Sequence, residues 1–163
     1  MIISVTDNLE GKIEPLSYSD AAKVAALIRQ STQDANRGEY TPFELEKLNA
    51  FATPEKIQDE VSSGYLVMLS NDTGDLIGCA MVVRSGKNLV IKTIDVKTNY
   101  SRKGYGSLLY NRCEKRLKEV GLNEIEVEIP KFPKSEMFYK KHGFVKTGNP
   151  TREDLYFAMF KYL

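Results

Sequence analysis

The segment Val96-Lys-Thr-Asn-Tyr-Ser-Arg-Lys-Gly-Tyr-Gly-Ser-Leu-Leu109 joins two elements of different periodicity. Leu89–Val96 predicts a β-strand, whereas Gly104–Val120 carries apolar residues at helical spacing. The segment after this helix, Glu124–Ile129, alternates strictly between charged and apolar residues and predicts another strand. A helix between two strands of one sheet makes a crossover, so we expect these two strands to be parallel.

The residues on either side extend this unit into a larger sheet. Tyr65–Leu69 and Leu76–Arg84 are apolar runs that precede the Leu89–Val96 strand across short turns, which predicts an antiparallel meander. Downstream, we expect a short helix at Ser135–His142 and strands at Phe144–Lys146 and Leu155–Lys161. The sequence therefore predicts an α/β (α+β) fold with one mixed, mostly antiparallel sheet flanked by helices.

The N-terminal third contributes the first strand and most of the remaining helices. The strand candidates are Ile2–Val5 and Lys12–Leu16. The other expected elements are a helix from about Asp20, a polar loop at Gln33–Tyr40, and helices that begin at Thr41-Pro42 and Thr53-Pro54.

Composition restricts the class of protein. A chain of 163 residues favours a single domain over residues 1–163. The net charge of +1 argues against a general nucleic-acid binder. We expect no membrane span and no signal peptide, and Cys79 and Cys113 in apolar surroundings predict buried free thiols. These observations predict a cytoplasmic protein that uses no metal.

The loop before the central helix has the features of an anion site. The first N–H groups of a helix lack partners within the helix and lie at the positive end of its dipole. Gly104 and Gly106 let the backbone approach a ligand closely, and Arg102 and Lys103 add positive charge. The loop lacks the third glycine of a dinucleotide fingerprint, since Leu109 stands there. From the residues alone, a plain glycine turn and a nucleotide-phosphate binder of another fold stay open.

Two motifs resemble the GNAT superfamily of N-acetyltransferases. The loop is similar to its acetyl-CoA-binding motif, Gln/Arg-x-x-Gly-x-Gly/Ala after a strand ending Val-x-x-x-Tyr, with Ser101 where Gln or Arg is usual. Ser135-Glu-Met-Phe-Tyr-Lys-Lys-His-Gly-Phe144 resembles the family's Ala-x-x-Phe-Tyr-x-Lys-x-Gly-Phe segment. The resemblance covers about residues 65–147 and implies a parallel strand pair that splays at a cofactor cleft.

The resemblance also implies where acetyl-CoA is held. The backbone of Ile94, Asp95 and Val96 should pair with the pantetheine arm. The amides of the loop and first helical turn should hold the pyrophosphate; these belong to Arg102, Lys103, Gly104, Tyr105, Gly106 and Ser107. The family's cofactor-contacting asparagine falls on Phe132, so one contact is absent.

For catalysis, the resemblance assigns Tyr139 as the acid that protonates the leaving thiolate. Without the motif, Tyr139 would be interpreted as a core aromatic residue. Glu128, the last of three carboxylates on the Glu124–Ile129 strand, is the first candidate base, although a solvated strand face also explains it. Asp95 is the second candidate. His142, the only histidine, is interpreted as structural.

The resemblance predicts an N-acetyltransferase that moves acetyl to a primary amine by direct attack. The acceptor stays open among small molecules, polyamines, amino acids and protein N-termini, and the sequence leaves homodimer formation open. An acidic and aromatic group in the first helices is a candidate acceptor lining; it comprises Glu39, Tyr40, Phe43, Glu44 and Glu46. The alternative is a non-catalytic acyl-CoA-binding or interaction module of the same fold.

Overall fold

The computed structural model describes residues 1–151 and 155–163 and forms a seven-stranded sheet in the order β1-β2-β3-β4-β5-β7-β6. The strands are β1 (Ile2–Asp7), β2 (Tyr65–Ser70), β3 (Leu76–Ser85), β4 (Asn88–Val96), β5 (Glu124–Pro130), β6 (Val145–Thr151) and β7 (Tyr156–Tyr162). The helices are α1 (Tyr18–Ala35), α2 (Pro42–Leu48), α3 (Pro54–Val61), α4 (Tyr105–Glu119) and α5 (Pro133–Lys141), with a 3-10 turn η1 (Thr98–Tyr100).

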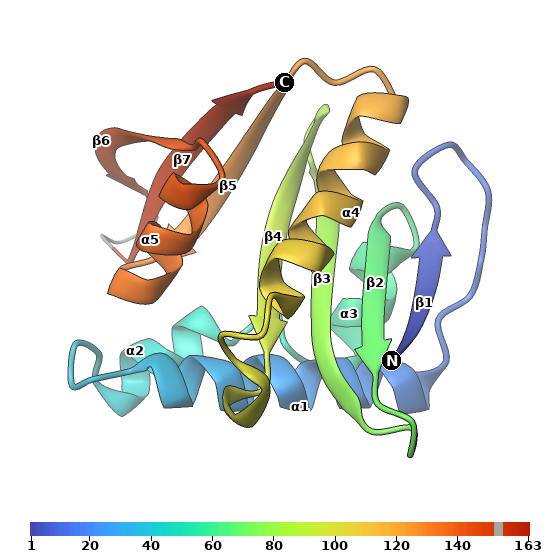
Figure 1. Cartoon of the computed structure of the whole chain (residues 1–163), viewed down its shortest axis with the longest axis horizontal. Helices are drawn as coiled ribbons and strands as arrows, with labels where there is room; N and C mark the ends of the chain where they lie inside the picture. Colours follow the sequence, from blue (N-terminus) through green and yellow to red (C-terminus); the bar gives the residue numbers. More distant parts are fainter. Residues whose placement is uncertain (152–154) are drawn as a thin grey trace.

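The sheet is antiparallel except between β4 and β5, as the sequence predicts. β2, β3 and β4 form the expected meander. β4 and β5 run parallel but pair only at Val90 with Glu126 and at Ile91 with Val127. Beyond these residues the two strands diverge, as Figure 1 shows, while β5 stays paired with β7 along its whole length. The predicted splayed parallel pair is therefore confirmed.

Helices cover both faces of the sheet. α1 and α3 pack on one face through an apolar cluster that includes Ile28, Ile57 and Met81. α4 lies across the opposite face and α5 lies beside it over the β5–β7 half (Figure 1). These two helices share a core with the sheet that includes Leu109 and Tyr139. Both surfaces of the sheet are thus buried, in agreement with the apolar runs of β2 and β3.

A third, smaller cluster joins the two halves of the molecule below the splay. Tyr40, Leu48 and Phe132 pack there with Leu155 and Tyr156. The Tyr40 hydroxyl donates to the Leu155 carbonyl at 3.0 Å and accepts from the Lys131 amide at 2.8 Å. The segment before α2 is thereby fixed to the start of β7, across the gap between β4 and β5.

The helix starts follow the predicted capping residues, but one helix end differs. Thr41 forms a capping box with Glu44, and Thr53 caps α3. α1 begins at Tyr18 after Ser17 and continues to Ala35, so the predicted loop is shorter than 33–40. The amide of Asn36 donates to the carbonyls of Thr32 and Gln33, so the helical hydrogen bonding continues over the polar residues 33–35.

One strand alternative is resolved and one strand boundary is corrected. Of the two candidates for the first strand, Ile2–Val5 is confirmed as part of β1 (Ile2–Asp7), and residues 12–16 form no strand because the buried side chain of Asn8 bonds the backbone of Glu14 instead. β6 begins at Val145 rather than Phe144, since the Phe144 amide bonds the Tyr139 carbonyl and its ring enters the core.

Both cysteines are buried and free, as predicted. Within the described ranges, none of the helices combines the length and the apolarity needed to span a bilayer.

Candidate active site

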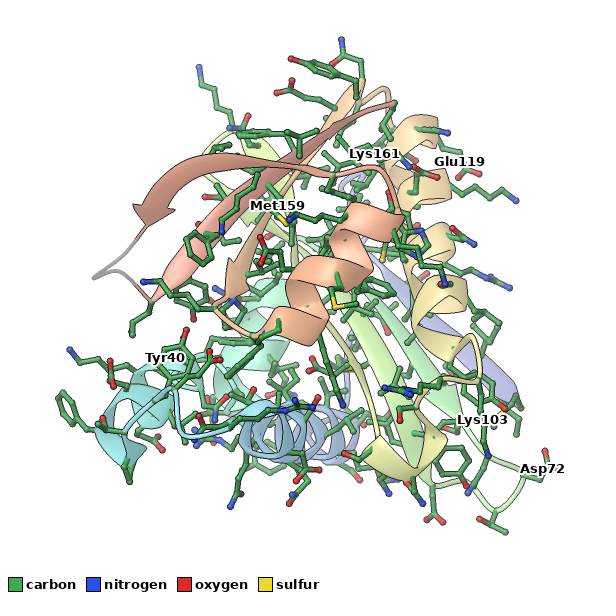
Figure 2. The ribbon with its side chains drawn as sticks, turned by 60° about the vertical axis from the view of Figure 1, so that its left-hand side comes forward. Tyr40, Asp72, Lys103, Glu119, Met159 and Lys161 are labelled. Atoms are coloured by element: carbon green, nitrogen blue, oxygen red, sulfur yellow. The ribbon has the colours of Figure 1, made fainter. Side chains whose placement is uncertain are left out.

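The N-terminal end of α4 is an open cluster of backbone amides. The chain reaches it through η1 and two residues with positive φ, Arg102 at 60° and Gly104 at 85°. Gly104 occupies the N-cap position and has no side chain with which to cap the helix. Arg102 and Lys103 are exposed beside it, and Figure 2 shows Lys103 at this end of α4. The predicted loop residues therefore lie together as an anion-binding geometry.

The two glycines of the motif have different roles in the structure. A Cβ built on Gly104 would meet nothing within 4 Å, so this position is open to a ligand. A Cβ built on Gly106 would lie 3.1 Å from Cε2 of Phe138. Gly106 therefore lets α5 pack closely on α4, whereas Gly104 keeps the amides accessible. The open amides and adjacent cations fit the diphosphate of a CoA molecule.

The free edge of β4 provides a second set of backbone groups. The amide of Lys97 donates to Ile77 on β3 at 2.8 Å, and Asp95 is paired with Cys79, also on β3. Because neighbouring residues of a strand direct their N–H and C=O groups to opposite sides, those of Ile94 and Val96 are directed toward the splay. These two residues fit an extended amide-bearing chain such as pantetheine, while Asp95 enters the site through its side chain.

The splay opens into a cavity of about 530 Å³. Its walls come from α1, α2, α3, β3, β4, β5, α5 and β7. The polar and aromatic lining residues are Ser31, Thr32, Phe51, Asp59, Glu60, Ser63, Arg84, Ser85, Lys92, Thr93, Asp95, Glu128, Phe132, Ser135, Tyr139 and Tyr156. Three residues that the sequence singled out for catalysis, Tyr139, Glu128 and Asp95, thus line one cavity although they lie on three different elements.

Tyr139 combines a packed ring with a free hydroxyl. Its ring makes edge contacts with Phe138 at 5.1 Å and Phe144 at 5.3 Å between centroids. Its hydroxyl makes no hydrogen bond to the part of the chain whose side chains the structure describes, and the side chain lines the cavity. Burial, followed by the nearby Asp95 charge, raises the pKa of Tyr139 well above that of an ordinary tyrosine. The hydroxyl is therefore protonated at neutral pH and available to donate.

Asp95 is a carboxylate held in place by two hydroxyl groups. Thr93 on the same face of β4 and Ser31 on α1 both donate hydrogen bonds to it. Burial raises the pKa of Asp95 to about 6, and the two hydrogen bonds act in the opposite direction. At pH 7 most of this carboxyl is therefore ionised, while it retains enough basicity to take up a proton.

Glu128, the first candidate base, lies across the splay on β5, where it pairs with Ala158 of β7. It is half-buried and lines the same cavity. Glu124 and Glu126 on the same strand do not line it, so only the last of the three alternating carboxylates reaches the site.

The predicted acceptor lining is corrected. The first helices do line the cavity, but the predicted group of five residues from Glu39 to Glu46 does not. Tyr40 is buried in the third cluster, Phe43 is 70% exposed, and Glu44 is used in the α2 cap. The carboxylates that α3 contributes instead are Asp59 and Glu60.

Several lining residues were missed by the sequence analysis. Thr93 is two residues before Asp95, so strand periodicity could have placed it on the same face. Ser31 had no such signal, because only the packing of α1 on β4 brings it to Asp95.

Comparisons with known proteins identify the family and similar folds. The sequence model described as the acetyltransferase (GNAT) domain matches residues 36–162. No curated protein matches the chain in sequence. Among solved structures, the PaiA N-acetyltransferase of Thermoplasma acidophilum in complex with coenzyme A is 21% identical over 100% of both chains, with a TM-score of 0.78.

Two further solved structures share the fold. A GCN5-related N-acetyltransferase of Rhodopseudomonas palustris is 21% identical with a TM-score of 0.75, covering 100% of this chain and 99% of that one. A GNAT-family acetyltransferase of Staphylococcus aureus Mu50 is 16% identical with a TM-score of 0.71, covering 99% of each chain. Since the family match spans most of the sequence, the chain belongs to the acetyltransferase (GNAT) domain family.

Proposed function

We propose that this protein is an N-acetyltransferase that moves the acetyl group of acetyl-CoA directly to a primary amine. The observation that carries the proposal is the pairing of a free, protonated Tyr139 hydroxyl with the Asp95 carboxylate in one cavity. This cavity lies where β4 loses its strand partner, next to backbone groups suited to pantetheine. No metal is part of the proposed reaction.

Acetyl-CoA would be held mainly by backbone. The amides of residues 102–107 would bind the diphosphate, with Arg102 and Lys103 adding charge. Ile94 and Val96 would pair with the pantetheine arm and direct the thioester into the splay. A CoA complex of the similar T. acidophilum protein supports this choice of donor.

The charge of the cavity favours a cationic acceptor. Four carboxylates line it, those of Asp59, Glu60, Asp95 and Glu128, against the two cations of Arg84 and Lys92. Lys92 lies 4.7 Å from the centroid of the Phe51 ring, so this cation is also in contact with an aromatic face. An ammonium group would find a net negative environment there.

The amine must lose a proton before it can attack, because an alkylamine has a pKa of about 10.4 and arrives charged. We assign the acceptance of this proton to Asp95, directly or through a water molecule, since two hydroxyls fix its carboxylate in the cavity. Glu128, the first candidate in the sequence, is the alternative on the opposite wall.

The neutral amine then attacks the thioester carbonyl carbon, and the C–S bond breaks. Tyr139 gives its proton to the leaving thiolate and recovers one from solvent. The nitrogen loses its second proton as the amide forms. In total the amine loses two protons and the thiolate gains one, so one proton is released for each acetyl group transferred.

The test is release of free CoA thiol from acetyl-CoA over a panel of amines that includes alkylamines, polyamines, amino acids and peptides with free N-termini. Amine-dependent release, with the acetylated amine identified by mass spectrometry, is the expected result. Binding of CoA without release for any amine would instead support the non-catalytic module. Failure to bind CoA would exclude both functions.

A further inference from the structure

A hydrogen bond links the first turn of α4 to the end of α5. Ser107 is the third residue of α4, and its Oγ lies 3.0 Å from Nε2 of His142. The sequence analysis interpreted His142 as structural, and the proposed reaction does not use it. The imidazole ring of His142 nevertheless contacts Ser107, which belongs to the predicted diphosphate site.

The imidazole is held in this position by contacts with two aromatic rings. Its centroid lies 4.3 Å from that of Tyr110 and 4.8 Å from that of Phe138. Phe138 also abuts Gly106, so the same aromatic group fixes both the helix start and the imidazole. His142 is partly buried, and its Nε2 is directed at the turn that carries the free amides.

This hydrogen bond can be made in two directions. When Nε2 is unprotonated, Ser107 donates to it, and the serine hydrogen is then not available to a ligand. When Nε2 carries a proton, His142 donates to Oγ, and Ser107 can donate outward. An anion at the helix start selects the second arrangement, because it needs a donor and is attracted to a positive imidazolium.

We propose that His142 is a positioning residue for the CoA diphosphate, which turns the Ser107 hydroxyl toward the anion and takes up a proton as CoA binds. The proposal rests on the proposed use of acetyl-CoA. It adds a residue to the cofactor site that is remote from the acetyl-transfer cavity and is linked to pH.

The charged surroundings set the direction of the pH effect. Lys161 on β7 and Lys141 on α5 face His142, and Glu114 on α4 faces it with opposite charge. Glu114 is bound by Lys161 at 2.6 Å, a lysine that Figure 2 shows beside the upper part of α4. Burial and the two lysines lower the pKa of His142, so it is neutral at pH 7 in the absence of a ligand.

A bound diphosphate adds negative charge and therefore raises the pKa of His142 again. By linkage, affinity for CoA must increase as pH falls from above the bound-state pKa to below that of the free protein. Each unit of upward shift corresponds to about a tenfold gain in affinity.

His142 is the only histidine in the chain, so its ring resonances can be assigned without ambiguity by NMR. The experiment titrates them on the full-length, tag-free protein between pH 5 and 8, with and without dephospho-CoA. This probe keeps the diphosphate but lacks the 3′-phosphate, whose own titration near pH 6 would obscure the result. We expect the pKa to move upward by about one unit on binding.

Variants test the route through Ser107. His142→Phe should weaken dephospho-CoA binding about tenfold at pH 6 and much less at pH 8, as measured by calorimetry. His142→Gln keeps a neutral donor and should restore part of the affinity with no pH dependence. Ser107→Ala should reduce the pH dependence without abolishing it, because the diphosphate charge still acts on the imidazole. Ser107→Ala combined with His142→Phe should lose less affinity than the sum of the two single losses.

The outcomes separate this inference from the proposed function. Binding of dephospho-CoA with an unshifted His142 pKa would overturn the inference and leave the N-acetyltransferase intact. Additive losses in the double variant would also overturn it, because His142 would then act independently of Ser107. No binding of either CoA form to the wild-type protein would overturn both proposals.

Discussion

The two ends of the candidate site are built in different ways. The proposed diphosphate end consists of consecutive residues, Arg102 to Ser107, and would act mainly through backbone amides at the start of α4. The transfer cavity instead takes side chains from α1, α3, β4, β5 and α5. The diphosphate end can be recognised in a single stretch of sequence, whereas the transfer cavity forms only when segments that are distant in the sequence pack together. This difference predicts different responses to substitution at the two ends.

The largest effect is expected at the backbone end. Gly104→Asp would place a carboxylate at the proposed diphosphate site, at a position with φ of 85°. Repulsion between two charges about 4 Å apart near a surface is about 4 kcal/mol, so CoA affinity should fall roughly a thousandfold. Calorimetric titration with CoA measures the loss.

A matched control separates charge from backbone strain. Gly11 has a similar φ of 80° and equally open surroundings, but its neighbour Glu10 pairs with Arg116 near the C-terminal end of α4 rather than with the helix start. The control variant is Gly11→Asp. It should lower thermal stability to a similar extent and leave CoA affinity unchanged. Equal affinity in Gly104→Asp and the control would mean that the loop is only a turn.

At the transfer end, Tyr139→Phe removes the proton donor and keeps the packed ring. We expect kcat to fall about a hundredfold, in the range of general acid catalysis, with CoA affinity within a factor of two of wild type. Tyr162→Phe, an 83% exposed tyrosine, is the control for the substitution itself. A kcat that is unchanged in Tyr139→Phe would remove this residue from the mechanism.

The next effect is on the pH profile. Asp95 must be ionised to accept a proton, so kcat/KM should fall as pH drops through about 6, the pKa of this carboxyl. Asp95→Asn should lose this limb and about tenfold to a hundredfold in rate, while keeping the dependence on amine ionisation at higher pH. If Glu128→Gln loses the limb and Asp95→Asn retains it, the base is Glu128.

Asp95→Asn should not lower the free energy of unfolding at neutral pH. Because burial raises the pKa of Asp95 in the folded protein, its ionised form is disfavoured there relative to the unfolded chain. This penalty is present above pH 6 and disappears as pH falls below the ordinary carboxyl pKa. Urea unfolding at pH 7.5 should therefore show Asp95→Asn to be as stable as wild type or more stable.

The smallest effect on function is expected at the second glycine. Gly106→Ala introduces a Cβ 3.1 Å from the Phe138 ring and should lower the free energy of unfolding by about 1–3 kcal/mol. CoA affinity should change by no more than a few-fold, in contrast to Gly104→Asp. A large loss of affinity without destabilisation would show that Gly106, like Gly104, is needed for ligand approach.

Most of the architecture was predictable from local patterns. The alternation in Glu124–Ile129 and the helical spacing in Gly104–Val120 predicted the crossover, and the parallel pair follows from it. The errors fell where a tertiary contact outweighed a local pattern. Residues 12–16, the second candidate for the first strand, have an apolar–polar pattern but are bonded by the buried Asn8 side chain. Phe144 lies just before β6, and its ring packs in the core.

The candidate residues divide in the same way. The sequence by itself, with the family resemblance of its motifs, determined which residues are candidates for the diphosphate loop and that Tyr139 is the candidate acid, because a helix start and a short motif are encoded by neighbouring residues. Tertiary structure alone decided that Ser31 meets Asp95, that α3 rather than the predicted group from Glu39 to Glu46 supplies acidic groups to the cavity, and that His142 meets Ser107. These contacts join residues on separate elements, and only the packing of helices on the splayed sheet brings such groups within hydrogen-bonding distance.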